Sequence, residues 1–307
     1  MIMSNLMDLS IIIPHKNSQN LLQRCLDSIP ESDNIEIIII DDNSSNVNKE
    51  IFPGVNRKDT KVIFSETDIT AGGARNIGLD HVSNKWMIFA DADDFFLKDA
   101  FVVFEKTLVN QEIDIYYFRV SSVFSDTLER ATRDKGVNTL VDHFLTDEAK
   151  LRLKHIVPWG KVFSSEFVRR NSIRFDEVPA SNDIMFGVKT GFLAKKITVI
   201  QQEVYCVTMN RGSISNTLTA QNNRSRYIVM LKYNEYLRKN QYNSFQNSIR
   251  PFIFNSLKFG FIDFFESLKL MFYYKDSFFY NFHPFRSAKT FLNIKMNREK
   301  NSKYIIK

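Results

Sequence analysis

The chain has 307 residues, enough for one large or two smaller domains, and its hydrophobic fraction of 44% and charged fraction of 25% are those of a globular protein. This composition excludes a disordered, collagenous or coiled-coil chain. Two cysteines, Cys25 and Cys206, are too few for a disulfide framework, so we expect reduced thiols and a cytoplasmic protein.

The net charge of +6 is unevenly distributed along the chain. Residues 221–307 contain 16 Lys and Arg against 5 Asp and Glu, a net charge of +11, and 13 of the 28 phenylalanines. The longest aliphatic runs, 9–13 and 37–40, are far shorter than the roughly 20 residues that span a bilayer, and residues 1–10 lack the basic start of a secretory signal. We therefore expect no transmembrane helix and a chemically distinct C-terminal region.

Over the first hundred residues, short β-branched runs alternate with amphipathic ones, which predicts an α/β fold with a mostly parallel central sheet. The expected elements are strands at 9–13, 35–40, 61–64 and 86–90, a helix at 20–29, and a helix at 74–82 that opens after Gly72 and Gly73. Further on we expect strands at 115–123 and 197–205, helical stretches around 147–155 and 183–194, a loop at 159–161, and helices from 224 to about 297.

Polar side chains gather where these strands end. They are His15, Lys16 and Asn17, then Asp41 and Asp42, then Asp91, Asp93 and Asp94. Open α/β sheets bind ligands at the carboxyl ends of their strands, so we expect these side chains to share one rim. Clustered carboxylates normally persist by holding a cation, and oxygen ligands select Mg²⁺ or Mn²⁺ together with the phosphates of a substrate. The pattern therefore predicts a nucleotide diphosphate or triphosphate; the alternative is a set of solvated turn residues.

Four segments resemble those of the family 2 glycosyltransferases, inverting enzymes with the nucleotide-sugar-binding GT-A fold. They are LSIIIPHKN at 9–17, EIIIIDDNSS at 36–45, GGARNIG at 72–78 and MIFADADD at 87–94. Weaker similarity continues through WGKVF at 159–163, RFDE at 174–177, Tyr205 and RGSI at 211–214. The resemblance ends near residue 215. It implies a nucleotide-sugar-binding half at 1–115 and an acceptor-binding half at 116–220. Composition alone adds a basic, aromatic-rich helical region at 221–307.

The resemblance also implies roles for individual residues. Asp42 matches the aspartate that pairs with uracil, and Asp91 and Asp93 form the DxD motif that contacts the ribose and the metal. Either Asp93 or Asp94 is the direct ligand of Mn²⁺ or Mg²⁺. The remaining nucleotide-sugar-binding candidates are Pro14, Asn17, Gly73, Arg75 and Arg211. Lys16 departs from the family, which commonly has an aromatic residue there to stack on the base.

Glycosyl transfer requires the acceptor hydroxyl to lose a proton, and a positioned carboxylate increases the rate by roughly 10² to 10⁴. Asp183 is the candidate base, although Asn182 stands where the family usually has Glu; the alternative is a helix cap, since Ser181, Asn182 and Asp183 precede an apolar helical run. On the acceptor side, Trp159 is either a stacking surface or a core residue, and Lys161 is either a phosphate contact or a solvated loop lysine. The five histidines show no zinc-ligand spacing.

These observations predict a metal-dependent inverting glycosyltransferase of the hexosyltransferase type. It would move a sugar from a UDP-sugar to a glycan or lipid-linked acceptor during synthesis of bacterial capsule, lipopolysaccharide or another surface polysaccharide. One alternative is a catalytically silent GT-A scaffold. Another is a sugar-phosphate nucleotidyltransferase, which needs a Gly-rich, Arg-containing loop where this chain has PHKN at 14–17.

The C-terminal region alternates aromatic and basic residues between 245 and 291. One interpretation is that such helices contact the anionic inner face of the cell membrane. The alternative is that they pack on the catalytic domain or on a second subunit, as in a homodimer. Nucleic-acid binding is the weakest interpretation, and we expect none.

Overall fold

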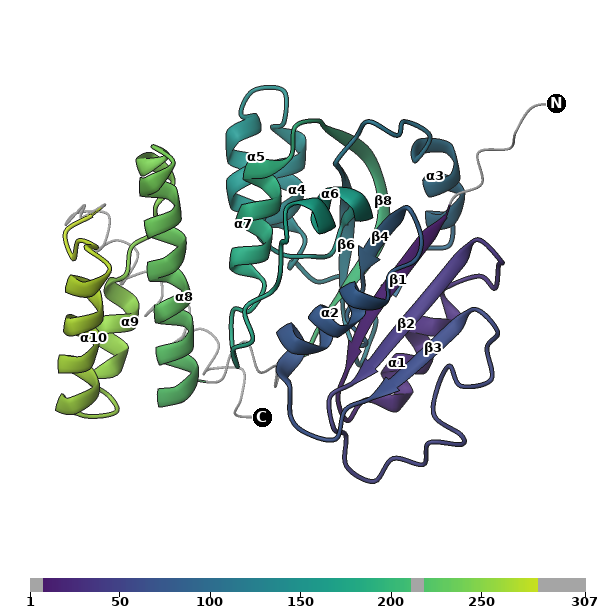
Figure 1. Ribbon diagram of the computed structural model, residues 1–307, viewed down its shortest axis with the longest axis horizontal. Helices are drawn as coiled ribbons and strands as arrows, with labels where there is room; N and C mark the ends of the chain where they lie inside the picture. The colour runs from purple at the N-terminus through teal and green to yellow at the C-terminus, as the bar shows by residue number, and fades with distance from the viewer. Residues whose placement is uncertain (1–7, 211–217, 281–307) are drawn as a thin grey trace, which may run out of the picture.

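The computed structural model describes residues 8–210 and 218–280, which form a sheet flanked by helices and a separate group of C-terminal helices (Figure 1). The strands are β1 (Leu9–His15), β2 (Ile35–Asp41), β3 (Thr60–Phe64), β4 (Trp86–Phe89), β5 (Phe95–Phe96), β6 (Ile115–Phe124), β7 (Lys161–Ser164) and β8 (Ile197–Met209). Their order in the single eight-stranded sheet is β3-β2-β1-β4-β7-β6-β8-β5. Four of the neighbouring pairs are parallel and three, β4 with β7, β7 with β6 and β8 with β5, are antiparallel.

Both faces of the parallel strands are covered, which explains their unbroken aliphatic sequences. Ile37 and Ile39 of β2 join the core on the side of α1 (Gln19–Asp27), whereas Ile38 and Ile40 join the core on the side of α2 (Thr70–His81). Helix α2 lies so close to β1 that a Cβ on Gly78 would come within 2.4 Å of Ile12. The alternation of side chains along each strand therefore assigns its apolar residues to two separate cores.

The five remaining helices before α8 have six to ten residues each. They are α3 (Ala100–Thr107), α4 (Lys135–Asp142), α5 (Glu148–Lys154), α6 (Ser165–Arg170) and α7 (Ile184–Leu193). The sequence did not predict α3, α4, α6, β5 or β7, each of which is ten residues or fewer. Residue 161 was expected in a loop and instead begins β7, where it pairs with Tyr117 of β6. Such short elements carry too few residues for a clear apolar period.

Helix α2 begins four residues earlier than predicted, so Gly72 and Gly73 lie in its first turn instead of before it. A Cβ at Gly72 would approach the backbone oxygen of Asp176 to 2.2 Å. The glycine therefore provides room for a neighbouring segment, 176–182, and does not mark a turn.

Three helices follow the sheet: α8 (Ala220–Lys239), α9 (Arg250–Ser256) and α10 (Phe261–Tyr273), with a short 3₁₀ turn, η2 (Asn243–Phe245), between the first two. Thr219 caps α8 by accepting a hydrogen bond from Asn222 at 3.1 Å. Figure 1 shows α8 next to α7, with α9 and α10 on its far side. None of the helices within the described residues is both long and apolar enough to cross a bilayer.

Candidate active site

The candidate site lies at the carboxyl ends of β1 and β4, an edge of the sheet that we call the crevice. The chain runs outward from β1 to β2 and β3, then returns to add β4 on the other side of β1, which makes this the point where strand order reverses. Asp41 of β2 is level with His15, and Phe89 of β4 is level with Ile12. Asp42 and Asp91 therefore follow two strands separated by one, at a lateral spacing of about 10 Å. The predicted rim of polar residues is present at this edge.

The rim beside β2 is built on hydrogen bonds to two aspartates. Asp42 accepts a hydrogen bond from the backbone of Ile69 at 2.6 Å, and its other oxygen lies 3.6 Å from Nζ of Lys16. Lys16 also pairs with Asp68 at 2.7 Å. Asp41, in contrast, is occupied by His15, whose Nδ1 lies 2.7 Å from Oδ1 of Asp41. Both oxygens of Asp41 are thus engaged by His15 and Ser44, whereas Asp42 has one oxygen near Lys16 and is the better candidate for binding a base.

The other candidates on this side are positioned by backbone geometry. Asn17 has a positive φ of 53° and its side-chain oxygen accepts a hydrogen bond from the backbone of Ser45 at 2.8 Å. Pro14 is buried within β1, and Gly73 is buried in the first turn of α2. Of the three, Asn17 follows β1 in a loop, whereas Pro14 and Gly73 belong to a strand and a helix. Arg211, the remaining candidate, lies outside the described residues.

Arg75 joins the two sides of the crevice. Its Nη2 donates to Oδ1 of Asp91 at 2.6 Å, and its Nη1 donates to Oδ1 of Asn182 at 2.9 Å. The guanidinium also lies 5.4 Å from the ring centre of Phe175, and Arg75 is only 6% exposed. Helix α2 therefore holds one cation between the end of β4 and the segment that precedes α7.

Three carboxylates gather after β4. Asp91, Asp93 and Asp94 each offer one oxygen, and these three oxygens lie within 4.8 Å of one another. Asp94 is fully buried; its Oδ1 accepts a hydrogen bond from Thr208 at 2.7 Å, while its Oδ2 has no partner. Burial, together with the charges of Asp91 and Asp93, raises the pKa of Asp94 well above its usual range, and burial and Asp91 also raise the pKa of Asp93. The cluster has the oxygen chemistry and the uncompensated charge that suit a divalent cation.

Asp183 occupies the N-cap position of α7, but its side chain makes no capping hydrogen bond. The cap alternative therefore fails for its carboxylate, which is half-buried and lies near Arg75, Asp91 and Lys161. Burial raises the pKa of Asp183, and the charge of Asp91 adds to the rise, while Arg75 and Lys161 oppose it. A carboxylate with a raised pKa beside the cluster is a reasonable proton acceptor.

The two acceptor-side candidates are buried in the structure. Trp159 is 3% exposed and belongs to the core cluster, which supports the core alternative. Lys161 is 0% exposed and its Nζ donates to the backbone oxygen of His155, so the expectation of a solvated loop lysine is wrong. Burial lowers the pKa of Lys161 to about 7. As placed, neither side chain reaches the surface to meet an acceptor.

Two further residues support the cluster: Tyr205, which the sequence already matched to the family, and Arg24, which it did not single out. Arg24 of α1 donates to the backbone oxygen of Asp93 at 2.6 Å and to Ser125, and the hydroxyl of Tyr205 accepts a hydrogen bond from the backbone of Asp91 at 2.8 Å. Both hold the backbone of the carboxylate cluster. For Arg24, the only signal in the sequence was its position as a single arginine on the apolar helix 20–29, and such a position does not indicate a specific role.

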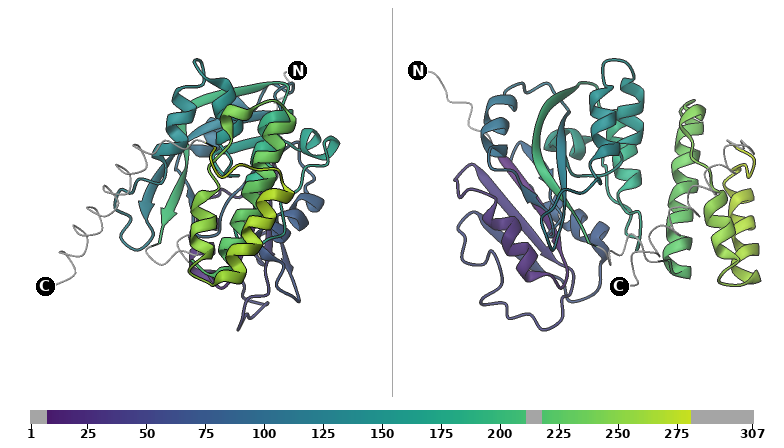
Figure 2. Two further views of the ribbon diagram at one scale, coloured as in Figure 1. Left: turned by 90° about the vertical axis from the view of Figure 1, so that its left-hand side faces the viewer. Right: turned by 180° about the vertical axis from the view of Figure 1, so that it is seen from behind.

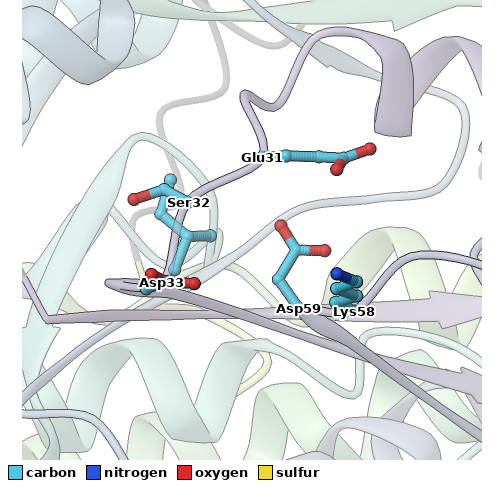
Figure 3. A pocket seen from close by; sticks show the side chains of 6 residues that line it. Glu31, Ser32, Asp33, Lys58 and Asp59 are labelled. Carbon is cyan, nitrogen blue, oxygen red and sulfur yellow. The ribbon is translucent and has the colours of Figure 1, made fainter.

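A hollow of about 390 Å³ lies at the amino ends of β2 and β3; Figure 3 shows the side chains that line it. It is lined by residues that precede β2 and β3, including Glu31, Asp33 and Asp59. Asp59 is already paired with Arg57 at 2.9 Å. We therefore do not assign the function to this hollow.

Comparisons with known proteins agree with this geometry. The family model described as "Glycosyl transferase family 2" matches residues 10–171. The chain is 27% identical over 226 residues to the glycosyltransferase GlyA of Streptococcus pneumoniae, covering 69% of this chain and 32% of that protein. It is 26% identical over 214 residues to a poly(ribitol-phosphate) beta-glucosyltransferase of Bacillus spizizenii, covering 67% and 33%. The chain thus spans about a third of the length of these two relatives.

Solved structures share the fold. TarS 1-349 of S. aureus in complex with UDP-GlcNAc has a TM-score of 0.60 at 20% identity, over 83% of this chain and 74% of that one. The mannosyltransferase PcManGT of Pyrobaculum calidifontis, in complex with GDP-Man and Mn²⁺, has a TM-score of 0.54 at 13% identity, over 94% and 80%. With the α/β sheet, the crevice and the acidic cluster already in place, the match of the family model over more than half of the sequence shows that the chain belongs to glycosyl transferase family 2.

Proposed function

We propose that this protein is a metal-dependent inverting glycosyltransferase that moves a sugar from a UDP-sugar to a glycan or lipid-linked acceptor of a bacterial surface polysaccharide. The observation that carries the proposal is the position of Arg75, which connects Asp91 of the acidic cluster with Asn182, the neighbour of Asp183. A donor-binding cluster and a candidate base are thereby held on one crevice. Such an arrangement suits displacement at a sugar carbon between a diphosphate and an attacking hydroxyl.

The donor assignment depends on Asp42. A carboxylate oxygen matches the donor edge of uracil, and TarS binds UDP-GlcNAc on the same fold. PcManGT binds GDP-Man, so the fold itself accepts both bases. Lys16, 3.6 Å from Asp42, takes the place of the stacking residue and supplies a positive charge at the base or phosphate edge.

The carboxylate cluster fits a divalent cation. The orphaned Oδ2 of Asp94 and the raised pKa values of Asp93 and Asp94 indicate negative charge that the protein does not compensate by itself. Asp93 is the better candidate for the direct ligand because Asp94 is fully buried and already bound to Thr208, whereas Asp93 is half-buried. Bound Mn²⁺ or Mg²⁺ would neutralise charge on the leaving diphosphate.

Two residues of the chain, Arg75 and Asp183, have the other roles in the proposed reaction. Arg75 orients Asp91 and adds positive charge beside the diphosphate side of the crevice. Asp183 accepts the proton of the acceptor hydroxyl as that oxygen attacks the sugar carbon from the face opposite the diphosphate. Because the new bond forms on the opposite face in one displacement, the configuration at the sugar carbon inverts.

The acceptor class comes from the relatives, one of which acts by its name on poly(ribitol-phosphate). We extend this to a polyol phosphate, glycan or lipid-linked saccharide that is elongated at the inner face of the cell membrane. A cytoplasmic location follows from the nucleotide-sugar donor, which is a cytoplasmic metabolite class. A homodimer remains a prediction from the composition of the C-terminal region.

Titration calorimetry with UDP, with and without Mn²⁺, tests the proposal most directly. We expect binding that requires the metal and that is lost in Asp93→Asn, followed by transfer from one member of a panel of UDP-sugars. Metal-independent or absent binding of UDP would instead support the silent scaffold. Formation of a nucleotide sugar from a sugar phosphate and a nucleoside triphosphate would support the nucleotidyltransferase; the chain lacks a Gly-rich loop after β1 for that reaction.

A further inference from the structure

Helix α10 exposes large apolar side chains along one face. Phe261, Phe265 and Phe272 lie four and seven residues apart and are 77%, 58% and 72% exposed, and Ile262 and Tyr273 beside them are 81% and 79% exposed. These spacings place all five on one side of the helix, which we call the outer face. Lys269 is exposed on the same side. A water-facing helix surface is normally polar, so five large apolar side chains exposed around one lysine indicate a binding surface.

The opposite side of α10 is already used for packing. Phe264, Leu268 and Met271 contact a core that includes Tyr227 and Leu231 of α8. The helix is therefore apolar on both sides, and only one side is covered by the described residues. Figures 1 and 2 show α10 on the side of the molecule away from the sheet, and in the left view of Figure 2 it faces the viewer.

The charge around the outer face favours an anionic partner. Lys258, Lys269 and Lys275 are exposed beside it, and residues 221–307 as a whole have a net charge of +11. Of the carboxylates nearby, Glu266 pairs with Lys269 at 2.7 Å and Asp276 pairs with Arg238 at 3.2 Å, while Asp263 adds a negative charge on the helix, so the positive excess is that of residues 221–307 as a whole. Two copies of this region would repel each other, which disfavours a second copy of the chain as the occupant. Aromatic rings flanked by lysines are the combination that binds an anionic lipid surface.

We infer that the outer face of α10 binds the surface of an anionic lipid bilayer, with Phe261, Ile262, Phe265, Phe272 and Tyr273 entering the headgroup region. Exposed Phe254 and Leu257 of the adjoining α9 segment extend the apolar contact. The helix lies on the bilayer and does not cross it. This inference rests on the C-terminal helices and not on the candidate active site, so it stands or falls separately from the transfer reaction.

A tryptophan placed on the outer face reports insertion. Trp86 and Trp159 are 2% and 3% exposed, so Phe265→Trp adds the exposed indole whose emission responds to its surroundings. We expect a blue shift when vesicles of phosphatidylcholine and phosphatidylglycerol are added, and a smaller shift with phosphatidylcholine alone. The matched control is Leu145→Trp, at a position that is 92% exposed between α4 and α5, which should show no shift.

Two results would overturn the inference. One is the absence of any shift of Phe265→Trp with the anionic vesicles. The other is a blue shift without vesicles that grows with protein concentration, because this would identify a second copy of the chain as the occupant.

Co-sedimentation with the same vesicles gives an independent measurement. The double variant Phe261→Ser/Phe265→Ser should bind on the order of 100-fold more weakly, since each inserted ring contributes about tenfold. Both side chains are exposed, so the thermal unfolding temperature should not change. Leu145→Ser should bind like the parent, and added salt should weaken parental binding.

Equal binding by the double variant and the parent would contradict the inference. The proposed function has a separate readout, because Asp183→Asn should lose transfer and keep vesicle binding. Loss of vesicle binding with transfer to a soluble acceptor intact would conversely affect only the outer face.

Discussion

Nη2 of Arg75 lies 2.6 Å from Oδ1 of Asp91, and this contact joins α2 to the end of β4 in the middle of the candidate active site. The second contact of the same guanidinium, to Asn182, reaches the segment that begins α7. One buried side chain therefore fixes the separation between the acidic cluster and Asp183. The planar guanidinium can donate to two acceptors at once in a fixed geometry, and the single ammonium group of a lysine cannot reproduce this geometry.

Arg75→Lys should lower transfer by about 10² and weaken UDP binding, because one ammonium cannot hold Asp91 and Asn182 together. It should also lower the free energy of unfolding by about 1–3 kcal/mol, as Arg75 is 6% exposed and Asp91 keeps partial contact with water. Steady-state kinetics and urea unfolding measure the two effects. The control is Lys196→Ala, which breaks an exposed ion pair with Glu112 and should change stability by less than about 1 kcal/mol. Full activity of Arg75→Lys would contradict a role in holding the crevice.

Asp183→Asn should lower kcat by about 10² to 10⁴ and leave the affinity for UDP unchanged, because the amide cannot accept the proton. The parent should lose activity as the pH falls through the pKa of Asp183, and burial moves this loss to a higher pH than for an ordinary aspartate. A pH–rate profile measures this limb. Asp147→Asn is the matched control: Asp147 caps α5 through a hydrogen bond from Lys150 and lies at another helix start. Wild-type kcat in Asp183→Asn would remove Asp183 as the base.

Asp93→Asn should abolish the stabilisation that Mn²⁺ gives to the parent in the presence of UDP. The reason is the loss of one of three carboxylates whose oxygens lie within 4.8 Å of one another. A thermal-shift titration with Mn²⁺, with chelator as the reference, measures the effect. Asp99→Asn changes an exposed aspartate a few residues further along and should keep the parental response. A parental response in Asp93→Asn would exclude this residue as a ligand.

Gly72→Ala should destabilise the protein by about 2 kcal/mol and reduce transfer, since its Cβ would meet the backbone oxygen of Asp176 at 2.2 Å. The displaced segment, 176–182, leads to Asp183. In Gly136→Ala the new Cβ meets nothing within 4 Å on α4, so the same substitution should be neutral or stabilise by up to about 1 kcal/mol. Chemical unfolding of the two variants side by side distinguishes close approach from helix propensity. Equal stabilities would refute the close packing of α2.

Lys161→Met tests whether this lysine is buried in the folded protein. Burial lowers the pKa of Lys161 from 10.5 to about 7, so the unfolded chain binds more protons than the folded one between these two values. The parent should therefore gain stability as the pH rises from about 7 toward 10.5, by a few kcal/mol. Lys161→Met removes this part of the pH dependence, and unfolding at a series of pH values measures it. Lys189→Met, a half-buried lysine of α7, should retain the parental slope. An unchanged slope in Lys161→Met would mean that the lysine is not buried as described.

The sequence determined the parallel half of the sheet, because β-branched runs such as 35–40 satisfy a strand buried on both faces and no other element. It also determined the order of the polar residues at the strand ends, since the carboxyl ends of parallel strands share one edge. Asp42, Asp91 and Asp93 were found in this way. Five short elements between residues 95 and 170 were not predicted, namely β5, α3, α4, β7 and α6, because stretches such as Phe95–Phe96 are too brief to show a period.

Tertiary structure alone decided what each polar residue contacts. Lys161 and Trp159 belong to a sequence that is compatible with a surface loop, and only the packing of β7 between β4 and β6 buries them. The acidic cluster is contacted by three residues that lie 16 to 114 positions away in the sequence: Arg24, Arg75 and Tyr205. The contacts of Arg24 and Tyr205 are made to backbone atoms of the cluster, which carry no sequence signal. Local sequence specifies the backbone period and the chemistry at strand ends, whereas burial and charge pairing depend on segments brought together by folding.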